Sequence, residues 1–106
     1  MKQGFSAANI VDEAGNPAGG TARCTGIDIR WQDGPLGRGP ARKDPNGAFV
    51  ETVIAIAIQR LEFYQMSRFA CTANLNAIVH LQDALGFLQD RTRLREEREV
   101  EGTHTV

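Results

Sequence analysis

Arginines in the last part of the chain have the side chains best suited to bind an anion. Ten of the twelve basic residues are arginine, whose planar guanidinium can hold phosphate oxygens through two parallel hydrogen bonds. Arg91, Arg95 and Arg98 recur at helical spacing and therefore share one stripe of a helix. The tail that follows, residues 100–106, adds two threonine hydroxyls and a histidine. These residue types in this order predict a phosphate-binding site made by the stripe and the tail.

The same arginines admit a purely structural interpretation. Basic residues near the C-terminal end of a helix interact favourably with its dipole, and Arg93 and Glu97 have the spacing of an ordinary ion pair. Against this interpretation, Arg91 and Arg95 continue the apolar stripe that contains Leu88, so the charges extend a face with the pattern of a buried one. We favour anion binding and keep the solvated helix end as the alternative.

The remaining reactive residue types do not form a recognisable catalytic or metal-binding pattern. His80 and His104 are the two histidines, and neither has a cysteine or carboxylate at ligand spacing. No serine or cysteine stands in a catalytic context, so we expect a protein that is not an enzyme and needs no metal or cofactor. His80 is predicted in a core or interface, and Cys24 and Cys71 are predicted to be reduced and buried.

Size and charge narrow the class of protein. A chain of 106 residues is predicted to form one domain, and its formal net charge of −1 gives no general attraction to nucleic acid or a membrane. The longest apolar run, residues 53–58, is far too short to span a bilayer, and the first residues lack the apolar core of a signal peptide. We therefore expect an intracellular protein.

The first third of the chain predicts a small sheet. In Ile27–Trp31 apolar and polar residues alternate, which is typical of a half-buried strand with Trp31 as its anchor, and Asn9–Val11 is a second strand candidate. Residues 14–20 are rich in glycine and predict a break between the two strands. Residues 34–47, with Arg38 among them, form a Gly/Pro-rich loop that either approaches a ligand closely or is a flexible surface connection.

Two helices are predicted to fill most of the remainder, over residues 48–67 and 72–99. Asn46 is placed to cap the first helix, and Thr72 or Asn74 to cap the second. The short link between the helices makes them antiparallel. The predicted fold is therefore α+β, a small N-terminal antiparallel β-sheet followed by a long antiparallel two-helix hairpin and a short tail.

The first predicted helix is apolar on almost every side over its first three turns, and a small sheet with one further helix cannot cover it. We therefore predict a homo-oligomer in which helices pack across subunits. Asn74 and Arg91 stand seventeen positions apart on one helix, which is roughly 25 Å at 1.5 Å per residue. A site of mononucleotide size that uses both residues must therefore combine two subunits.

Several short blocks, in this order along the chain, resemble the phage-encoded Thoeris anti-defence 1 proteins, which share a helical-hairpin domain with the anti-CBASS 2 proteins. The more specific blocks are residues 31–38 (Trp-Gln-Asp-Gly-Pro-Leu-Gly-Arg) and the Glu-Gly-Thr-His of residues 101–104. Residues 45–51, Phe69–Cys71 and Arg91-Thr92 complete the series. The resemblance covers the chain from about residue 25 onward.

The resemblance implies a sponge, a protein that sequesters a nucleotide messenger without cleaving it, in the cytoplasm of the infected bacterial host. In the Thoeris branch the messenger is a cyclic ADP-ribose isomer made by a TIR-domain enzyme, and the family assembles as dimers and hexamers. The ligand-binding residues it implies are an aromatic that stacks on adenine, an asparagine, two arginines on the pyrophosphate and a closing tail. In this chain they are Tyr64 or Phe63, then Asn74, then Arg91 and Arg95, then Thr103 and His104, and Arg38 of the loop joins the candidate set.

Thr72-Ala73 stand where relatives are expected to carry Arg-Glu, a departure that bears on affinity or ligand choice. Three other functions remain open. The first is a sponge for the cyclic di- or trinucleotides of CBASS signalling alone. The second is an enzyme that hydrolyses the messenger, and the third is a helical oligomer that binds no ligand. A nucleic-acid binder is disfavoured because the arginines alternate with glutamates.

Overall fold

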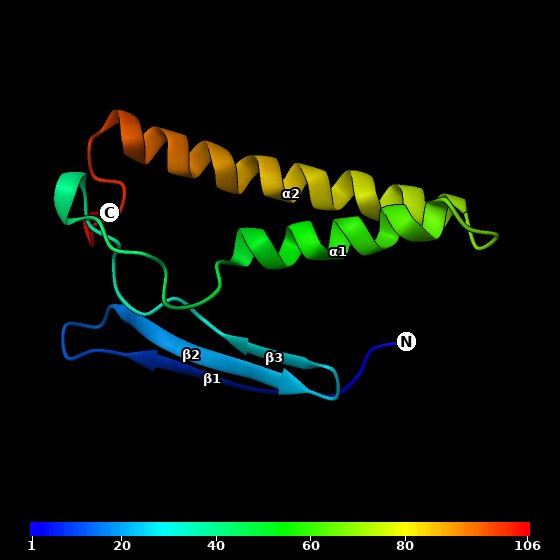
Figure 1. Cartoon of the computed structure of the whole chain (residues 1–106), viewed down its shortest axis with the longest axis horizontal. Helices are drawn as coiled ribbons and strands as arrows, with labels where there is room; N and C mark the ends of the chain where they lie inside the picture. Colours follow the sequence, from blue (N-terminus) through cyan, green and yellow to red (C-terminus); the bar gives the residue numbers. More distant parts are fainter. The chain divides into compact units, whose positions relative to one another are not determined.

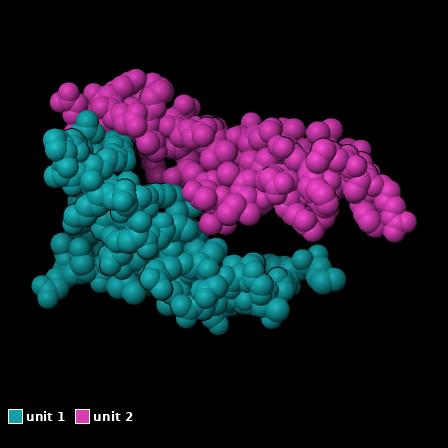
Figure 2. Space-filling model, viewed as in Figure 1, with its two compact units in different colours: residues 1–49, 100–106 teal, residues 50–99 magenta.

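The computed structural model describes all 106 residues and divides into two compact units (Figure 2). The first unit contains residues 1–49 and 100–106, and the second contains residues 50–99. The α+β class predicted from the sequence is confirmed. The elements, labelled in Figure 1, are strands β1 (Ser6–Val11), β2 (Pro17–Cys24) and β3 (Ile27–Arg30), the 3-10 turn η1 (Gly39–Ala41), and helices α1 (Val50–Gln65) and α2 (Thr72–Glu97).

The sheet has three antiparallel strands in the order β1-β2-β3, so the prediction of two strands was wrong. Residues 14–16 of the segment predicted to break the chain lie in the turn between β1 and β2, whereas residues 17–20 belong to the middle strand β2. Gly20 lies opposite Asn9 with φ +144°, and a Cβ at this position would stand 2.2 Å from the Ala8 oxygen. Glycine is therefore required here because it permits a close backbone approach within a strand, and it does not end the strand.

Backbone contacts and one side chain of the loop continue the bonding beyond the end of β3. Beyond β3, Trp31 forms a parallel bridge with Ala48, whose N–H donates to the Arg30 oxygen at 2.7 Å. The Asn46 side chain accepts from the Asp33 N–H and donates to the Asp33 oxygen, each at 2.9 Å. The prediction that Asn46 caps the first helix was therefore wrong, because its amide joins two parts of the loop, and α1 begins four residues later.

The helices α1 and α2 pack against each other but bury very little in one copy of the chain. Ile58 at 8% exposure and Ile78 at 7% are the buried hydrophobic residues. On the outer sides of the helices Ile56 is 63% exposed and Phe87 75% exposed. No helix is both long enough and apolar enough to cross a membrane.

The start of α2 differs from the prediction. Cys71 is its N-cap, and the thiol sulfur accepts from the Asn74 N–H at 3.4 Å, so neither Thr72 nor Asn74 is the cap. Cys71 is consequently exposed, which corrects the prediction that both cysteines are buried; Cys24 is half-buried, and both are free. His80, predicted in a core or interface, lies on an exposed position of α2 in the single chain.

Substitution of Gly20 tests the close approach at the middle strand. Gly20→Ala places a methyl group against the Ala8 oxygen, and we expect it to lower the free energy of unfolding by about 3 kcal/mol. Gly26→Ala is the matched control: Gly26 also has positive φ, at +83°, but open space surrounds it. Gly26→Ala should lower the free energy of unfolding by only about 1 kcal/mol. Urea denaturation measures both, and equal losses would contradict the steric explanation.

Candidate functional site

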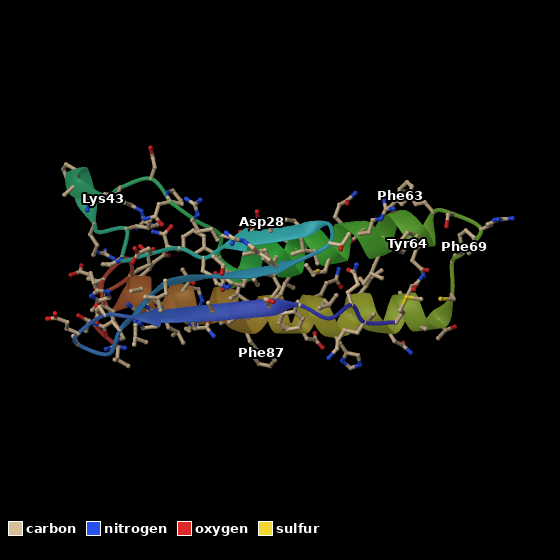
Figure 3. All side chains as sticks on the ribbon, turned by 90° about the horizontal axis from the view of Figure 1, so that it is seen from below. Asp28, Lys43, Phe63, Tyr64, Phe69 and Phe87 are labelled. Carbon is tan, nitrogen blue, oxygen red and sulfur yellow. The ribbon has the colours of Figure 1, made fainter.

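Aromatic residues gather around Arg60 near the C-terminal end of α1. The Arg60 guanidinium lies 4.9 Å from the ring centroids of both Phe63 and Tyr64, and its Nε donates to the Tyr64 hydroxyl at 3.2 Å. The two rings are 6.2 Å apart and tilted by 54° (Figure 3). Phe63 is 46% exposed and Tyr64 half-buried. The cluster thus presents aromatic surface beside a fixed positive charge, an arrangement suited to stacking on a base.

The turn between the helices is fixed by side chains that bind its backbone. The Gln65 amide accepts from the Cys71 N–H at 2.9 Å and donates to the Cys71 oxygen at 3.1 Å. The Ser67 hydroxyl accepts from the Phe69 N–H at 3.1 Å. The Asn74 amide nitrogen donates to the Phe69 oxygen at 3.2 Å. Asn74, predicted to contact a ligand, therefore has one nitrogen engaged in holding the turn, and its amide oxygen is oriented as a result.

The exposed tip of this turn carries a second cation–aromatic pair. The Arg68 guanidinium lies 4.9 Å from the centroid of Phe69, which is 65% exposed. Met66, three residues before Phe69 in the chain, is 81% exposed. Because the turn is tied down by Gln65 and Asn74, these apolar side chains are exposed on an ordered backbone.

The predicted phosphate-binding arginines lie at the other end of the helix pair. Arg91 on α2 lies 3.8 Å from a Glu51 carboxylate oxygen on α1, and its side chain is 64% exposed. Arg95, one turn further on, is half-buried. Arg93 forms the ordinary ion pairs of a solvated helix end. It pairs with Asp90 at 3.9 Å and with Glu97 at 2.7 Å along the exposed face.

The structure therefore separates the candidate residues of the hairpin into two groups. Phe63, Tyr64 and Asn74 lie at the tip, and Arg91 with Arg95 at the opposite end of the continuous helix α2. Arg91 stands seventeen positions after Asn74 on this helix, which is roughly 25 Å. Within one chain these two groups cannot contact the same mononucleotide.

The tail binds the Gly/Pro-rich loop within the first unit. The Gly37 N–H donates to the Gly102 oxygen at 2.7 Å, and an Arg38 guanidinium nitrogen donates to the Glu101 backbone oxygen at 3.1 Å. Arg42 makes a two-pronged contact with the Glu101 carboxylate, in which one arm measures 2.8 Å. Only 17% of the Glu101 side chain is exposed. Arg38 and the tail, both predicted to belong to a ligand site, are thus brought together.

Gly102 permits this docking because it has φ +78°, and a Cβ there would stand 2.4 Å from the Gly37 oxygen. Beyond it, the Thr103 hydroxyl donates to the Val100 oxygen and accepts from the Thr105 N–H at 3.2 Å. Thr103 therefore shapes the turn of the tail, and His104 next to it is exposed.

Sequence reasoning missed the roles of four side chains on which these arrangements depend. Arg60 had a usable signal, since it stands three and four positions before two aromatic residues and must share their helix face. The two hydrogen bonds of Gln65 to the Cys71 backbone, called here the Gln65 clamp, had no such signal. A glutamine at a helix end predicts no particular contact. Arg42 and Glu101 are 59 positions apart, and no local pattern predicts such a pair.

Comparison with known proteins places the sequence in a family. No protein-family model matches the sequence. Over 76 residues, however, the chain is 43% identical to Thoeris anti-defense 1 of Bacillus phage SBSphiJ7. The chain belongs to the Thoeris anti-defence 1 family. The aligned region is 72% of this chain, and the match covers 51% of the relative, so the chain spans about half the length of that Thoeris anti-defence 1 protein. The family assigned from the ordered sequence blocks is confirmed.

The Gln65 clamp can be tested by graded substitution. Gln65→Ala removes both hydrogen bonds to the Cys71 backbone, and we expect the free energy of unfolding to fall by about 2 kcal/mol. Gln65→Glu keeps the acceptor for the Cys71 N–H but places a charged oxygen against the Cys71 carbonyl oxygen, so it should also lower the free energy of unfolding. Thermal and urea unfolding give both values. Gln59→Ala, at an exposed position of the same helix, is the control and should change stability little.

The docking of the tail is tested by Glu101→Gln, which keeps the shape of the side chain and removes its charge. Hydrogen exchange at the Gly37 amide, which is bonded to Gly102, should become faster because the contact with Arg42 no longer holds the tail. Glu97→Gln removes an exposed pair four residues apart on α2 and should leave that amide unchanged. Unaltered exchange at Gly37 in the Glu101 variant would show that the backbone contacts alone hold the tail.

Proposed function

We propose that this chain is a phage anti-defence protein that binds and sequesters a cyclic nucleotide immune messenger without cleaving it. The messenger proposed is a cyclic ADP-ribose isomer of TIR-based Thoeris signalling. The observation that carries the proposal is the 43% identity to Thoeris anti-defense 1. Since the chain spans about half of that relative, the ligand and the mechanism remain proposals supported by the chemistry of this chain's own residues.

The arginine end of the hairpin supplies groups that suit a pyrophosphate. Arg91 is held near α1 by a loose contact of 3.8 Å with Glu51, and most of its side chain is exposed. A single contact of 3.8 Å leaves other N–H groups of the Arg91 guanidinium available to a pyrophosphate. Arg95 lies one helical turn away and would provide the second guanidinium.

The tip of the hairpin supplies the complementary group for a base. Phe63 offers exposed ring surface, and Arg60 fixes its position relative to Tyr64. Stacking on one base contributes about 1–3 kcal/mol by alanine substitution. Asn74, oriented by its bond to Phe69, would present its amide oxygen to a base or ribose edge.

Both ends can contact one ligand only if two copies contribute. The 25 Å separation along α2, estimated roughly from its rise per residue, supports a site between the tip of one subunit and the arginine end of another. The exposed Ile56 and Phe87 on the outer sides of the helices support association through the hairpin. We propose a homo-oligomer, a dimer or a hexamer, in which assembly completes the site.

Sequestration sets different demands from catalysis. A sponge must bind the ground state of its messenger tightly, which favours side chains fixed in advance and has no requirement for a transition-state contact. The contacts of Arg60 and Asn74 with their neighbours are of this kind. The cytoplasm of the infected bacterium is the proposed site of action, since the messenger is produced there.

The first test mixes the purified protein with cyclic ADP-ribose isomers and a panel of cyclic di- and trinucleotides, and follows the melting temperature. A ligand at a thousand times its Kd stabilises the folded state by about 4 kcal/mol, which shifts the transition clearly. Each complex is then denatured by heat and the released nucleotide analysed by chromatography. Intact cyclic ADP-ribose isomer supports the proposal, a linear product identifies an enzyme, and stabilisation by cyclic oligonucleotides alone identifies a different messenger.

The second test compares two arginines on the same helix. Arg91→Ala should weaken messenger binding roughly 10- to 100-fold, the loss expected for a charge-assisted contact to phosphate. Arg93→Ala is the matched control, because Arg93 pairs with Asp90 and Glu97 on the exposed face and should leave the affinity unchanged. Titration calorimetry gives both affinities. Equal affinities for the two variants would show that Arg91 does not contact the messenger.

A further inference from the structure

The outer edge of β1 is a stretch of strand backbone without a neighbouring strand in the single chain. β1 occupies one edge of the three-stranded sheet (Figure 1), and all six of its residues are exposed. The chain after the opposite edge strand β3 continues into the bridge between Trp31 and Ala48. An edge strand presents N–H and C=O groups in the geometry that another strand requires.

The hydrogen bonds of the sheet determine which groups of β1 face outward. The Trp31 N–H donates to the Gly20 oxygen at 2.9 Å, so the Gly20 backbone faces the β3 side of β2. Successive residues alternate direction, and Thr21 therefore faces β1, where its partner is Ala8. Ala8 then faces inward, and its neighbours Ala7 and Asn9 direct their N–H and C=O groups to the open edge.

This edge lacks the features that commonly prevent strands from pairing. Residues 3–11 contain no charge and no proline, although charged residues and prolines are the usual means of blocking an edge. Exposed apolar side chains stand at both ends, with Phe5 at 62% and Val11 at 65%. The one such feature present is a register shift between Asn9 and Val11, which limits the regular edge to residues 6–9.

Charges on either side of this stretch favour one direction of pairing with an identical strand. Lys2 precedes the uncharged stretch, and Asp12 follows it. An antiparallel pair places the positive end of one strand beside the negative end of the other, whereas a parallel pair places like charges together. Only outward-facing residues can form hydrogen-bonded pairs. Pairing Ala7 with the same residue of the other copy meets this condition and also sets Lys2 opposite Asp12.

We propose that β1 pairs in antiparallel fashion with β1 of a second copy, centred on Ala7. The two sheets then form one continuous six-stranded sheet across a two-fold axis, with the same residues contributed by each copy. The occupant of the edge is this chain itself, because the strand complements its own charge pattern when reversed. The contact uses no residue of the hairpin, so it is separate from the helix association proposed above.

The test replaces one outward-facing donor. Ala7→Pro removes the N–H that faces the open edge and leaves the inward bonds of Ala8 to β2 in place. Because each copy carries the change, the β1–β1 contact loses two hydrogen bonds. The dissociation constant of the association made by this contact should rise about tenfold or more. Ala7→Thr keeps the N–H and favours a strand, so it should associate like the parent. Sedimentation equilibrium over a range of concentrations measures all three proteins.

Cross-linking provides a second measurement that does not depend on the proline variant remaining folded. In a background with Cys24→Ser and Cys71→Ser, Ala7→Cys should give a covalent dimer in high yield with a short bismaleimide. Thr25→Cys, exposed at the turn between β2 and β3, should give several-fold less. Unchanged association of Ala7→Pro, or a cross-linking yield at position 7 no higher than at position 25, would overturn the proposal. Messenger affinity, measured in parallel, reports separately on the proposed function.

Discussion

Ile58 and Ile78 are the hydrophobic residues that one copy of this chain buries, while many large apolar side chains remain exposed. Burial of apolar surface is the main source of folding stability, and a chain of 106 residues has little of it to begin with. The exposed apolar positions on both helices and on β1 therefore have the same physical origin. The chain contains more apolar surface than one copy removes from water, and this is the surface that the proposed association would bury.

With so small a core, polar side chains bonded to backbone groups carry an unusual share of the local order. Gln65 fixes the turn between the helices by pairing with the Cys71 backbone, and Asn46 holds the loop by pairing with Asp33 in the same way. Such contacts are directional, so they fix the backbone conformation where non-specific packing would permit several. At the hairpin tip this order would lower the cost of the proposed stacking, because rings that are already positioned lose less freedom on binding.

Helices and strands that follow from a regular spacing of apolar residues could be predicted from the sequence. Features that depend on one specific contact, such as a strand glycine or a helix cap, could not. Both helices and the strand at Ile27 followed from the spacing of apolar residues. The middle strand β2 was missed because glycines usually interrupt strands, while here Gly20 is needed for the approach to Ala8. Cys71 was missed as the cap because cysteine seldom caps a helix. The candidate residues were placed on the correct elements, but the partners that orient them, such as Arg60, were not predicted.

The contacts between the loop and the tail also constrain the order in which the molecule can form. The first unit is discontinuous in sequence, since residues 50–99 intervene before Glu101 and Gly102 return to the loop. During synthesis the N-terminal sheet leaves the ribosome first, yet the Gly37 N–H and the Arg42 guanidinium must remain bonded to water until residue 102 has emerged. Closing a loop of about sixty residues is slow compared with forming the hairpin inside it. The docking of the tail is therefore expected to be a late folding event that follows the completion of both helices.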